Sequence, residues 1–276
     1  MLTIREYARP KTMDEAMALL KSSKKSQVLG GCAMLRLGDK NIDVAVDLSD
    51  LGLDGITQVG DTVEIGAMAT LHQVETDPFL KQAYSGALSH AMRDIVGVQF
   101  RNIATLGGSV YGKFAFSDPN TALLALNTEL VLYGNRPMTF EDFLTKRKRR
   151  FDILEKIILK NSGTTKAAFD AIRSSRGDFA LLNAAASVTT PAKTGTGDSK
   201  SEYRIAVGIR PRVAKLAVNA MSYLNEAGLT PESARKAAQI AAEELDFGTN
   251  LRASKIYREA IAPALIQRTL LKLLKA

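Results

Sequence analysis

The first fifty residues alternate short apolar runs with one stretch of helical spacing. Residues 13–23 (MDEAMALLKSS) repeat apolar side chains on one face, which predicts an amphipathic helix, and Thr12 opens it with a capping-box pattern. The runs 26–31 (SQVLGG) and 43–49 (DVAVDLS) predict strands, and 33–38 (AMLRLG) predicts a short helix between them. This part of the chain therefore predicts a small α/β unit.

The hydrophobic period changes from about residue 53. The run ITQVGDTVEIGA predicts a β-hairpin that turns at Gly60 and Asp61. The elements expected after it are helices at 71–84, 86–97 and 119–127 and a strand at 128–134. The middle of the chain is thus predicted to be α+β.

The segment RNIATLGGSVYGKFAFSDPN, residues 101–120, has no clear helical or strand period. It predicts a long irregular loop, and loops of this length inside compact domains are typically functional or disordered. Its apolar and aromatic side chains, Tyr111, Phe114 and Phe116, argue against disorder. We therefore expect this loop to hold a ligand.

Strand-like runs come next, and helical runs close the chain. Strands are expected at 167–175, 179–190 and 202–209, which predicts an antiparallel meander with an exposed polar turn at 191–201. Thr230 and Pro231 are typical of a helix start. The last helix is expected to begin near Ala253, and Pro263 should kink it or split it in two.

A shift in composition at KNSGTTK, residues 160–166, indicates a domain boundary. We expect a first domain at 1–162, with lobes at 1–52 and 53–162, and a second domain at 163–276. No window approaches the ~18 apolar residues of a membrane span. The first residues also lack the order of a signal peptide, so we expect a cytoplasmic protein without membrane contact.

The chain carries few groups that could bind a metal ion. Cys32 is the one cysteine, so the chain alone can form no disulfide, cysteine-ligated iron–sulfur cluster or structural zinc site. His72 and His90 are the two histidines. Metal chemistry on this chain is therefore not expected.

The formal net charge of +8 favours an anionic cofactor or partner. Part of this excess lies in the basic run 146–150 (KRKRR), which is most simply a solvated loop. Contact with nucleic acid is the less favoured alternative, because no recognition motif accompanies the run.

Two glycine pairs are the candidate ligand sites. Gly30 and Gly31 lie between a predicted strand and a helix start, where free N–H groups and missing side chains let a phosphate approach the backbone. Gly107 and Gly108 offer a second such approach. Alone, each pair is more typical of a tight turn, and neither forms the G-x-G-x-x-G fingerprint or a P-loop.

The surroundings of both pairs carry a family resemblance. QVLGGCAMLRLGD resembles the segment written "aGGTdLl", and QFRNIATLGGSV resembles "qiRNvATiGGNi", of the FAD-binding subunits of molybdenum hydroxylases, the xanthine dehydrogenase and carbon monoxide dehydrogenase medium-subunit family. The resemblance continues through FSDPNTALLALNTELVLYG and RASKIYREAIAPALIQRTL. It covers nearly the whole chain in the same order.

This resemblance implies an α+β fold, with a two-lobed flavin-binding domain of the PCMH type followed by a smaller α+β domain of a three-stranded antiparallel sheet and helices. It also implies non-covalent FAD, held by one glycine loop from each lobe. Asp118 fits a helix cap before Pro119 as well. The residues that the resemblance places at FAD are Gln27, Val28, Leu29, Gly30, Gly31, Cys32, Ala33, Met34, Thr105, Gly107, Gly108, Ser109, Ser117, Asp118, Leu154 and Arg173.

The implied function is electron transfer. The chain would accept electrons from a two-iron-two-sulfur subunit and pass them through FAD to NAD+ or another acceptor, while molybdopterin lies on a large partner subunit. Cys32 stands where the family usually has Thr, Ser109 replaces Asn, and Asp170 occupies the place of a basic residue near the flavin. These replacements keep an alternative open, in which the chain is a non-catalytic scaffold of the same fold that binds FAD weakly or not at all.

Overall fold

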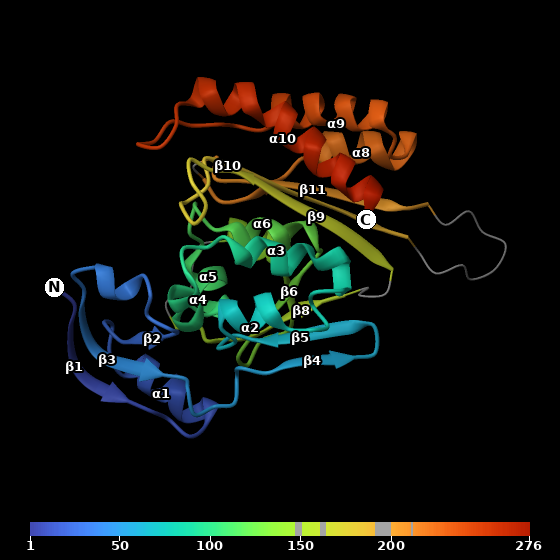
Figure 1. Cartoon of the computed structure of the whole chain (residues 1–276). Helices are drawn as coiled ribbons and strands as arrows, with labels where there is room; N and C mark the ends of the chain where they lie inside the picture. The colour runs from blue at the N-terminus through green and yellow to red at the C-terminus, as the bar shows by residue number, and fades with distance from the viewer. Residues whose placement is uncertain (147–150, 161–163, 191–199, 211) are drawn as a thin grey trace.

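The structure is a computed structural model that describes residues 1–146, 151–160, 164–190, 200–210 and 212–276. These residues form three β-sheets, with helices between and above them (Figure 1). Part of the basic run, residues 147–150, and most of the predicted polar turn, residues 191–199, lie outside the described residues.

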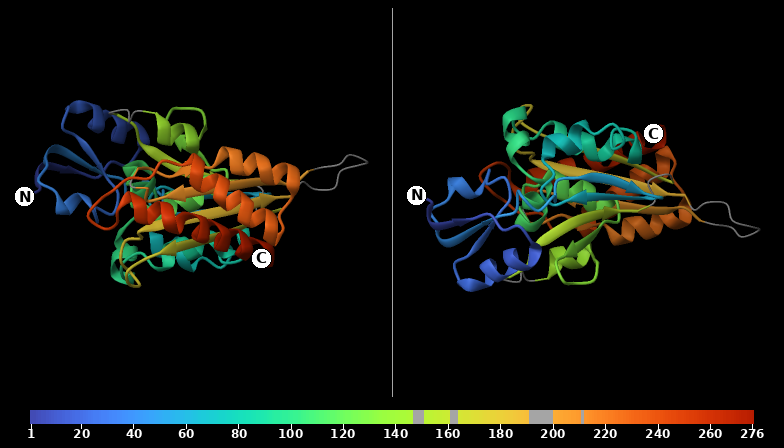
Figure 2. Two further views of the ribbon diagram at one scale, coloured as in Figure 1. Left: turned by 90° about the horizontal axis from the view of Figure 1, so that it is seen from above. Right: turned by 90° about the horizontal axis from the view of Figure 1, so that it is seen from below.

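A three-stranded parallel sheet of order β1-β3-β2 stands beside the rest of the molecule (Figure 2). The elements of this N-terminal unit are β1 (Thr3–Ala8), α1 (Met13–Ser22), β2 (Gln27–Leu29), the 3-10 helix η1 (Leu35–Leu37) and β3 (Asn41–Asp47). Helix α1 buries Ala16 and Leu20 against Val44 and Val46. The predicted α/β unit is confirmed, and β1 is an addition that the sequence pattern did not indicate.

The second sheet is antiparallel, with strand order β4-β5-β8-β6-β7. Its strands are β4 (Ile56–Val59), β5 (Thr62–Gly66), β6 (Glu129–Leu132), β7 (Met138–Thr139) and β8 (Leu154–Leu159). The helices with it are α2 (Leu71–Thr76), η2 (Ala83–Gly86), α3 (Ala87–Arg93), α6 (Asp118–Ala125) and α7 (Phe140–Thr145). The predicted hairpin and most of the predicted helices are confirmed.

The expected long loop at 101–120 is largely helical, so that prediction was wrong. The segment contains the end of α4 (Val98–Ile103), all of α5 (Leu106–Gly112) and the start of α6. Helix α5 is poor in helix-forming residues and depends on outside support. Thr105 caps it through a 3.1 Å bond to the Gly108 N–H, and the Leu106 N–H donates to the Ala69 carbonyl at 2.8 Å.

The third sheet, of order β12-β11-β10-β9, lies between two helical layers (Figures 1 and 2). Its strands are β9 (Thr165–Ile172), β10 (Leu182–Thr189), β11 (Glu202–Gly208) and β12 (Lys215–Leu216). Helices α8 (Val218–Ala227), α9 (Pro231–Glu244) and α10 (Lys255–Lys275) cover one face, and α3 and α6 cover the other. The three predicted strands are confirmed, β12 adds a fourth, and α10 continues through Pro263 without splitting.

The hydrophobic core crosses the predicted domain boundary. Phe169 and Ala185 of the third sheet belong to the same buried cluster as Ile65 and Leu123. All residues of α6 are buried. Helices α3 and α6 therefore lie between the second and third sheets and belong to a core that both sheets share. Within the described residues, no helix combines the length and the apolar character that crossing a membrane requires.

Candidate functional site

A cavity of about 580 Å³ lies where the N-terminal unit meets the rest of the molecule. Its walls come from the loop after β2, from helices α4 and α5, from the start of α6 and from the turn after β9. Small-molecule and cofactor sites typically have volumes of about 300 to 1,000 Å³. The cavity is therefore the candidate site for an organic ligand.

The first wall is the loop that follows β2, residues 30–34, which we call the first glycine loop. Cys32 adopts a left-handed conformation with φ of 56°, and its N–H donates to the Gly30 carbonyl, which turns the chain tightly. A Cβ atom on Gly31 would stand 1.5 Å from the Ile103 carbonyl oxygen. Gly31 therefore lets this loop press against the end of α4.

The first glycine loop carries unused hydrogen-bond donors. Among the described residues, the N–H groups of Gly31, Ala33 and Met34 donate no hydrogen bond. All three residues line the cavity. Successive N–H groups around a left-handed residue form a concavity that binds anions, and buried N–H groups need a partner. The loop is therefore suited to a phosphate group.

The second wall is the start of α5, residues 105–109, which we call the second glycine loop. The N–H groups of its glycine pair are already bonded: Gly107 donates to the Ala67 carbonyl at 2.9 Å, and Gly108 to the Thr105 hydroxyl at 3.1 Å. The expectation that this pair offers a second set of free N–H groups was wrong. A helical turn and the pairing with residues 67–71 consume those donors, so the loop presents hydroxyl groups instead.

The two glycine loops lie against each other. A Cβ atom on Gly30 would stand 2.8 Å from the Thr105 hydroxyl oxygen and 3.8 Å from the Gly108 Cα atom. A Cβ atom on Gly107 would stand 2.4 Å from the Ala67 carbonyl oxygen. Two of the four glycines, Gly31 and Gly107, thus permit close contact with backbone atoms, and Gly30 permits contact with the Thr105 side chain. This adds a structural reason for these glycines to the ligand access predicted from the sequence.

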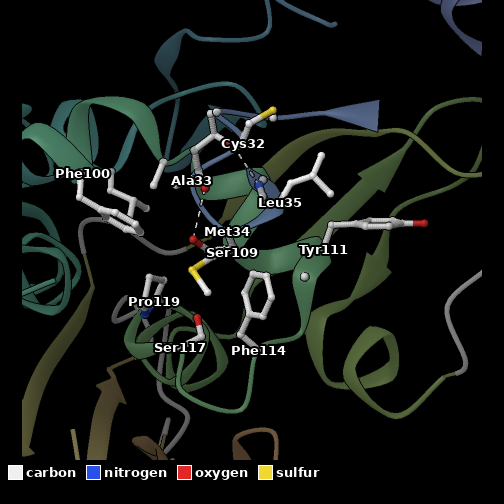
Figure 3. Close-up of a pocket in the computed structure, with 18 of the residues that line it drawn as sticks. Cys32, Ala33, Met34, Leu35, Phe100, Ser109, Tyr111, Phe114, Ser117 and Pro119 are labelled. Atoms are coloured by element: carbon white, nitrogen blue, oxygen red, sulfur yellow. Dashed lines mark hydrogen bonds between the residues drawn. The ribbon is translucent and has the colours of Figure 1, made fainter. Parts of the chain in front are cut away.

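The side chains between the loops alternate polar and apolar groups. Met34 of the first loop faces Ser109, Ser117 and Pro119, whereas the Cys32 sulfur points away from them (Figure 3). Burial, with the nearby Asp47 charge, raises the pKa of the Cys32 thiol, which keeps it protonated. The first loop therefore reaches the cavity through backbone N–H groups and not through the thiol.

An ion pair closes one end of the cavity. The Arg173 guanidinium donates to Asp118 Oδ2 at 2.5 Å, and the Asn183 amide donates to Asp118 Oδ1 at 2.6 Å. Burial raises the pKa of Asp118, and the contacts from Arg173 and Asn183 oppose that rise. The cap of α6 is Ser117, whose hydroxyl accepts from the Asn120 N–H, so Asp118 is not the cap residue.

The structure brings together every predicted site residue except Leu29, which is buried beside Ile42 and Ala45. The residues that line the cavity are Gln27, Val28, Gly30, Gly31, Cys32, Ala33, Met34, Thr105, Gly107, Gly108, Ser109, Ser117, Asp118, Leu154 and Arg173. Asp170 does not line it. This side chain turns toward α10 and pairs with Arg268 and Lys272, so its predicted place near the ligand was wrong.

An aromatic wall is the part of the site that the sequence did not assign. Phe116 stacks with Phe114 at a centroid distance of 5.1 Å and meets Phe179 edge-on at 4.6 Å. Phe100 and Tyr111 also line the cavity, and burial, with the Asp152 charge, raises the pKa of Tyr111 to about 12. The aromatic content of 101–120 was the available signal, whereas nothing local marks Phe179.

The residues present fit FAD. Unpaired N–H groups suit the pyrophosphate, and the buried Ser26 hydroxyl, which lines the cavity without a partner among the described residues, suits a polar edge of the nucleotide. The aromatic wall suits flat rings. Among the described residues, no group of three or more histidine, cysteine or acidic side chains could hold a metal ion.

Comparison with known proteins agrees with this geometry. Residues 2–160 match the family described as the FAD binding domain in molybdopterin dehydrogenase, and residues 167–273 match the CO dehydrogenase flavoprotein C-terminal domain. The nicotine 6-hydroxylase medium subunit of Paenarthrobacter nicotinovorans is 28% identical over 278 residues, with 96% of each chain covered. The carbon monoxide dehydrogenase medium chain of Hydrogenophaga pseudoflava is 25% identical over 279 residues, with 96% of this chain and 95% of that one covered.

Solved structures show the same fold. Carbon monoxide dehydrogenase from Hydrogenophaga pseudoflava, in a form that lacks the Mo-pyranopterin moiety of its cofactor, gives a TM-score of 0.86 at 25% identity, covering 98% of this chain and 97% of that one. Quinoline 2-oxidoreductase from Pseudomonas putida 86 gives 0.85 at 23% identity, covering 98% and 96%. The predicted α+β fold class, with its flavin-binding domain and C-terminal sheet and helices, is confirmed. The chain belongs to the family of FAD-binding medium subunits of molybdopterin hydroxylases, a group of oxidoreductases that includes carbon monoxide dehydrogenase and xanthine dehydrogenase.

Proposed function

We propose that the cavity between the two glycine loops holds FAD non-covalently, with the pyrophosphate at the first loop. The observation that carries this proposal is the set of unpaired N–H groups on Gly31, Ala33 and Met34. The hydroxyls of Thr105, Ser109 and Ser117 would then bind the cofactor from the opposite side. Bound FAD supplies the redox chemistry, and the chain supplies binding, orientation and electrostatics.

The place of this subunit in its complex is part of the same proposal. It takes electrons from a two-iron-two-sulfur partner and delivers them, through FAD, to NAD+ or another acceptor. The iron–sulfur centre is assigned to a separate subunit, because the lone Cys32 cannot ligate a cluster, and molybdopterin is assigned to a large partner subunit because the family resemblance implies one. A cytoplasmic location also stays a prediction, as do the domain limits of 1–162 and 163–276.

The rim of the cavity suits such a partner. Val96, Val98 and Ile103 are exposed large apolar residues on and beside α4, and Val96 also lines the cavity. A Cβ atom on Gly177 would stand 3.0 Å from the Val96 carbonyl oxygen, so the turn after β9 continues the same surface. Soluble surfaces seldom group exposed apolar side chains around a cavity mouth unless something binds there.

The charges on this rim favour an acidic partner surface. Arg176 pairs with Asp94 at 3.0 Å, Arg93 lies 3.6 Å from the same carboxylate, and Arg252 pairs with Asp178 at 2.8 Å. These ion pairs join three guanidinium groups to two carboxylates. We assign the rim to the iron–sulfur subunit, because an electron carrier must sit beside the cofactor that it reduces.

The second candidate is a scaffold subunit that binds FAD weakly or not at all. Cys32 and Ser109 still favour it, whereas Asp170 no longer does because it lies outside the cavity. Contact with nucleic acid rested on residues 146–150, most of which lie outside the described residues.

The visible absorption spectrum of the purified chain tests the proposal. A flavin band that stays with the protein through gel filtration is the expected result. A colourless chain that takes up no added FAD would contradict the proposal and support the scaffold subunit instead.

A further inference from the structure

A buried polar chain links the cavity to the third sheet. The Thr121 hydroxyl donates to Asn183 Oδ1 at 2.9 Å, and Asn183 donates through its amide nitrogen to Asp118 Oδ1 at 2.6 Å. Asp118 then holds Arg173 at 2.5 Å, and Arg173 donates to the Asp178 carbonyl at 2.7 Å. Only Asp118, Arg173 and Asp178 line the cavity. Thr121 and Asn183 lie behind them.

Asn183 occupies the centre of this chain. It is 0% exposed, comes from β10, and contacts α6 through both of its side-chain atoms. Gly208 on the neighbouring strand leaves it room, because a Cβ atom there would stand 2.4 Å from Asn183 Oδ1. An amide can accept from a hydroxyl through its oxygen and donate to a carboxylate through its nitrogen at once. The position therefore requires both ends of the amide.

We propose that Asn183 is a positioning residue for the flavin: by fixing the Asp118 carboxylate it holds the Arg173 guanidinium at the cavity wall, and so sets the affinity and reduction potential of bound FAD. This inference rests on the proposed function. A guanidinium has five N–H groups, and Asp118 and Asp178 take two of those on Arg173, so the held cation still presents donors and charge to the cavity.

The electrostatic consequence follows from the balance of charge at the wall. Reduction adds negative charge to a flavin, which a fixed cation favours, while the Asp118 carboxylate offsets part of that effect. Asp94 at the end of α3, which pairs with Arg176, is a further charged group that acts on Asp118. Losing the Asn183 amide removes a donor from the carboxylate, so Asp118 no longer fixes the Arg173 guanidinium at the wall and the reduced flavin loses part of its stabilisation by that cation.

The test compares two substitutions in the full chain loaded with FAD. Asn183→Leu should weaken FAD binding by about tenfold, the equivalent of one hydrogen bond to a charged group, and should move the midpoint potential to more negative values at neutral pH. Asn183→Asp should match the wild type at low pH, where the two carboxylates share a proton and one still donates to the other. At high pH its potential should fall, because a second carboxylate then ionises at the wall.

Ser187→Ala is the matched control. Ser187 lies on the same strand, is 1% exposed and bonds the Ala125 carbonyl at 2.6 Å, so it also ties β10 to α6 but at the end of α6 away from the cavity. The control should keep the affinity within about twofold of the wild type and the same potential at every pH.

The outcomes are distinct. If Asn183→Leu does not fold, Asn183→Asp and Thr121→Val carry the test. A wild-type chain that takes up no FAD would refute the proposed function. A wild-type chain that binds FAD, with Asn183 variants that reproduce its affinity and its potential at every pH, would refute the positioning role. If the Asn183 variants and Ser187→Ala have equal effects, Asn183 contributes only to the packing of β10 on α6, and the positioning role is refuted.

Discussion

The glycines of the two loops differ in how closely the surrounding atoms pack against them. Gly31 faces the Ile103 carbonyl at a distance that no side chain tolerates, whereas a Cβ atom on Gly108 meets only the Thr105 hydroxyl, at 3.0 Å. Gly31→Ala should therefore push the first loop off α4 and lower the free energy of unfolding by about 3 kcal/mol, with loss of FAD. Denaturant titration and the flavin spectrum measure the two effects.

Gly108→Ala is the comparison for that substitution. It should keep nearly all of the stability, because the Thr105 hydroxyl can shift by a few tenths of an ångström, and it should weaken FAD binding only where the new methyl meets the cofactor. Equal stability of the two variants would contradict the packing role assigned to Gly31.

Cys32 matters through its backbone. Its sulfur points away from Ser109, its thiol is kept protonated by burial, and its φ of 56° shapes the loop (Figure 3). Cys32→Ala should therefore leave the dissociation constant for FAD within about twofold, since alanine accepts that conformation about as well and removes no donor that reaches the cavity. Equilibrium dialysis with FAD measures this. A tenfold loss would mean that the thiol contacts the cofactor.

The residues of the site differ in whether the neighbouring sequence identifies them. The glycines and hydroxyls of both loops could be predicted because each loop is one continuous motif. Asn183 could not, because its bond to Asp118 joins positions 65 residues apart. Phe179 enters the aromatic wall in the same way, because it lies in the turn between β9 and β10, far in the sequence from Phe116.

At the scale of elements, Asp170 fastens α10 to β9. Burial raises the pKa of this carboxyl, but the hydrogen bonds from Arg268 and Lys272 outweigh it and bring the pKa below its usual value. Asp170→Asn should lower the free energy of unfolding by about 1 to 2 kcal/mol at pH 7, a discounted figure because both cations are partly exposed.

The pH dependence of that variant has a definite sign. A carboxyl with a lowered pKa in the folded state stabilises above the unfolded value of about 4, and the gain is lost as the pH falls through that region. Wild type and variant should converge in acid and separate toward neutrality, with FAD binding unchanged. If the variant loses FAD instead, the conclusion that Asp170 lies away from the flavin is wrong.

Elements that depend on distant partners were the hardest to predict. The residues of β1 do not alternate between buried and exposed positions, so the hydrophobic pattern does not indicate a strand there. The strand forms through parallel pairing with β3, in which Thr3 lies opposite Asn41. Helix α5 contains three glycines and is held by Thr105 and by the Ala67 and Ala69 carbonyls. Both elements follow from tertiary contacts that outweigh weak local preference.

At the scale of the whole molecule, the shared core limits how the chain can be divided. Helix α6 is buried between the second and third sheets, so a chain that ends near residue 162 would expose one whole side of it. Such a truncation should lose cooperative folding rather than only its partners. Binding to the partner subunits is therefore better tested by surface substitutions in the intact chain.

Substitutions on the cavity rim provide that test. Val98→Glu and Ile103→Glu each add a carboxylate to exposed positions on α4, so the fold and FAD content should be preserved, whereas binding to an acidic iron–sulfur partner should weaken by at least about tenfold through repulsion and desolvation. Val59→Glu is the control, a more exposed apolar residue on the β4–β5 hairpin, which extends away from α4 (Figure 1). Each variant is co-expressed with its partner subunits, and the complex is quantified by size exclusion. Loss of assembly in the α4 variants alone would support the rim as the docking surface, and equal assembly in all three would move the partner to another face.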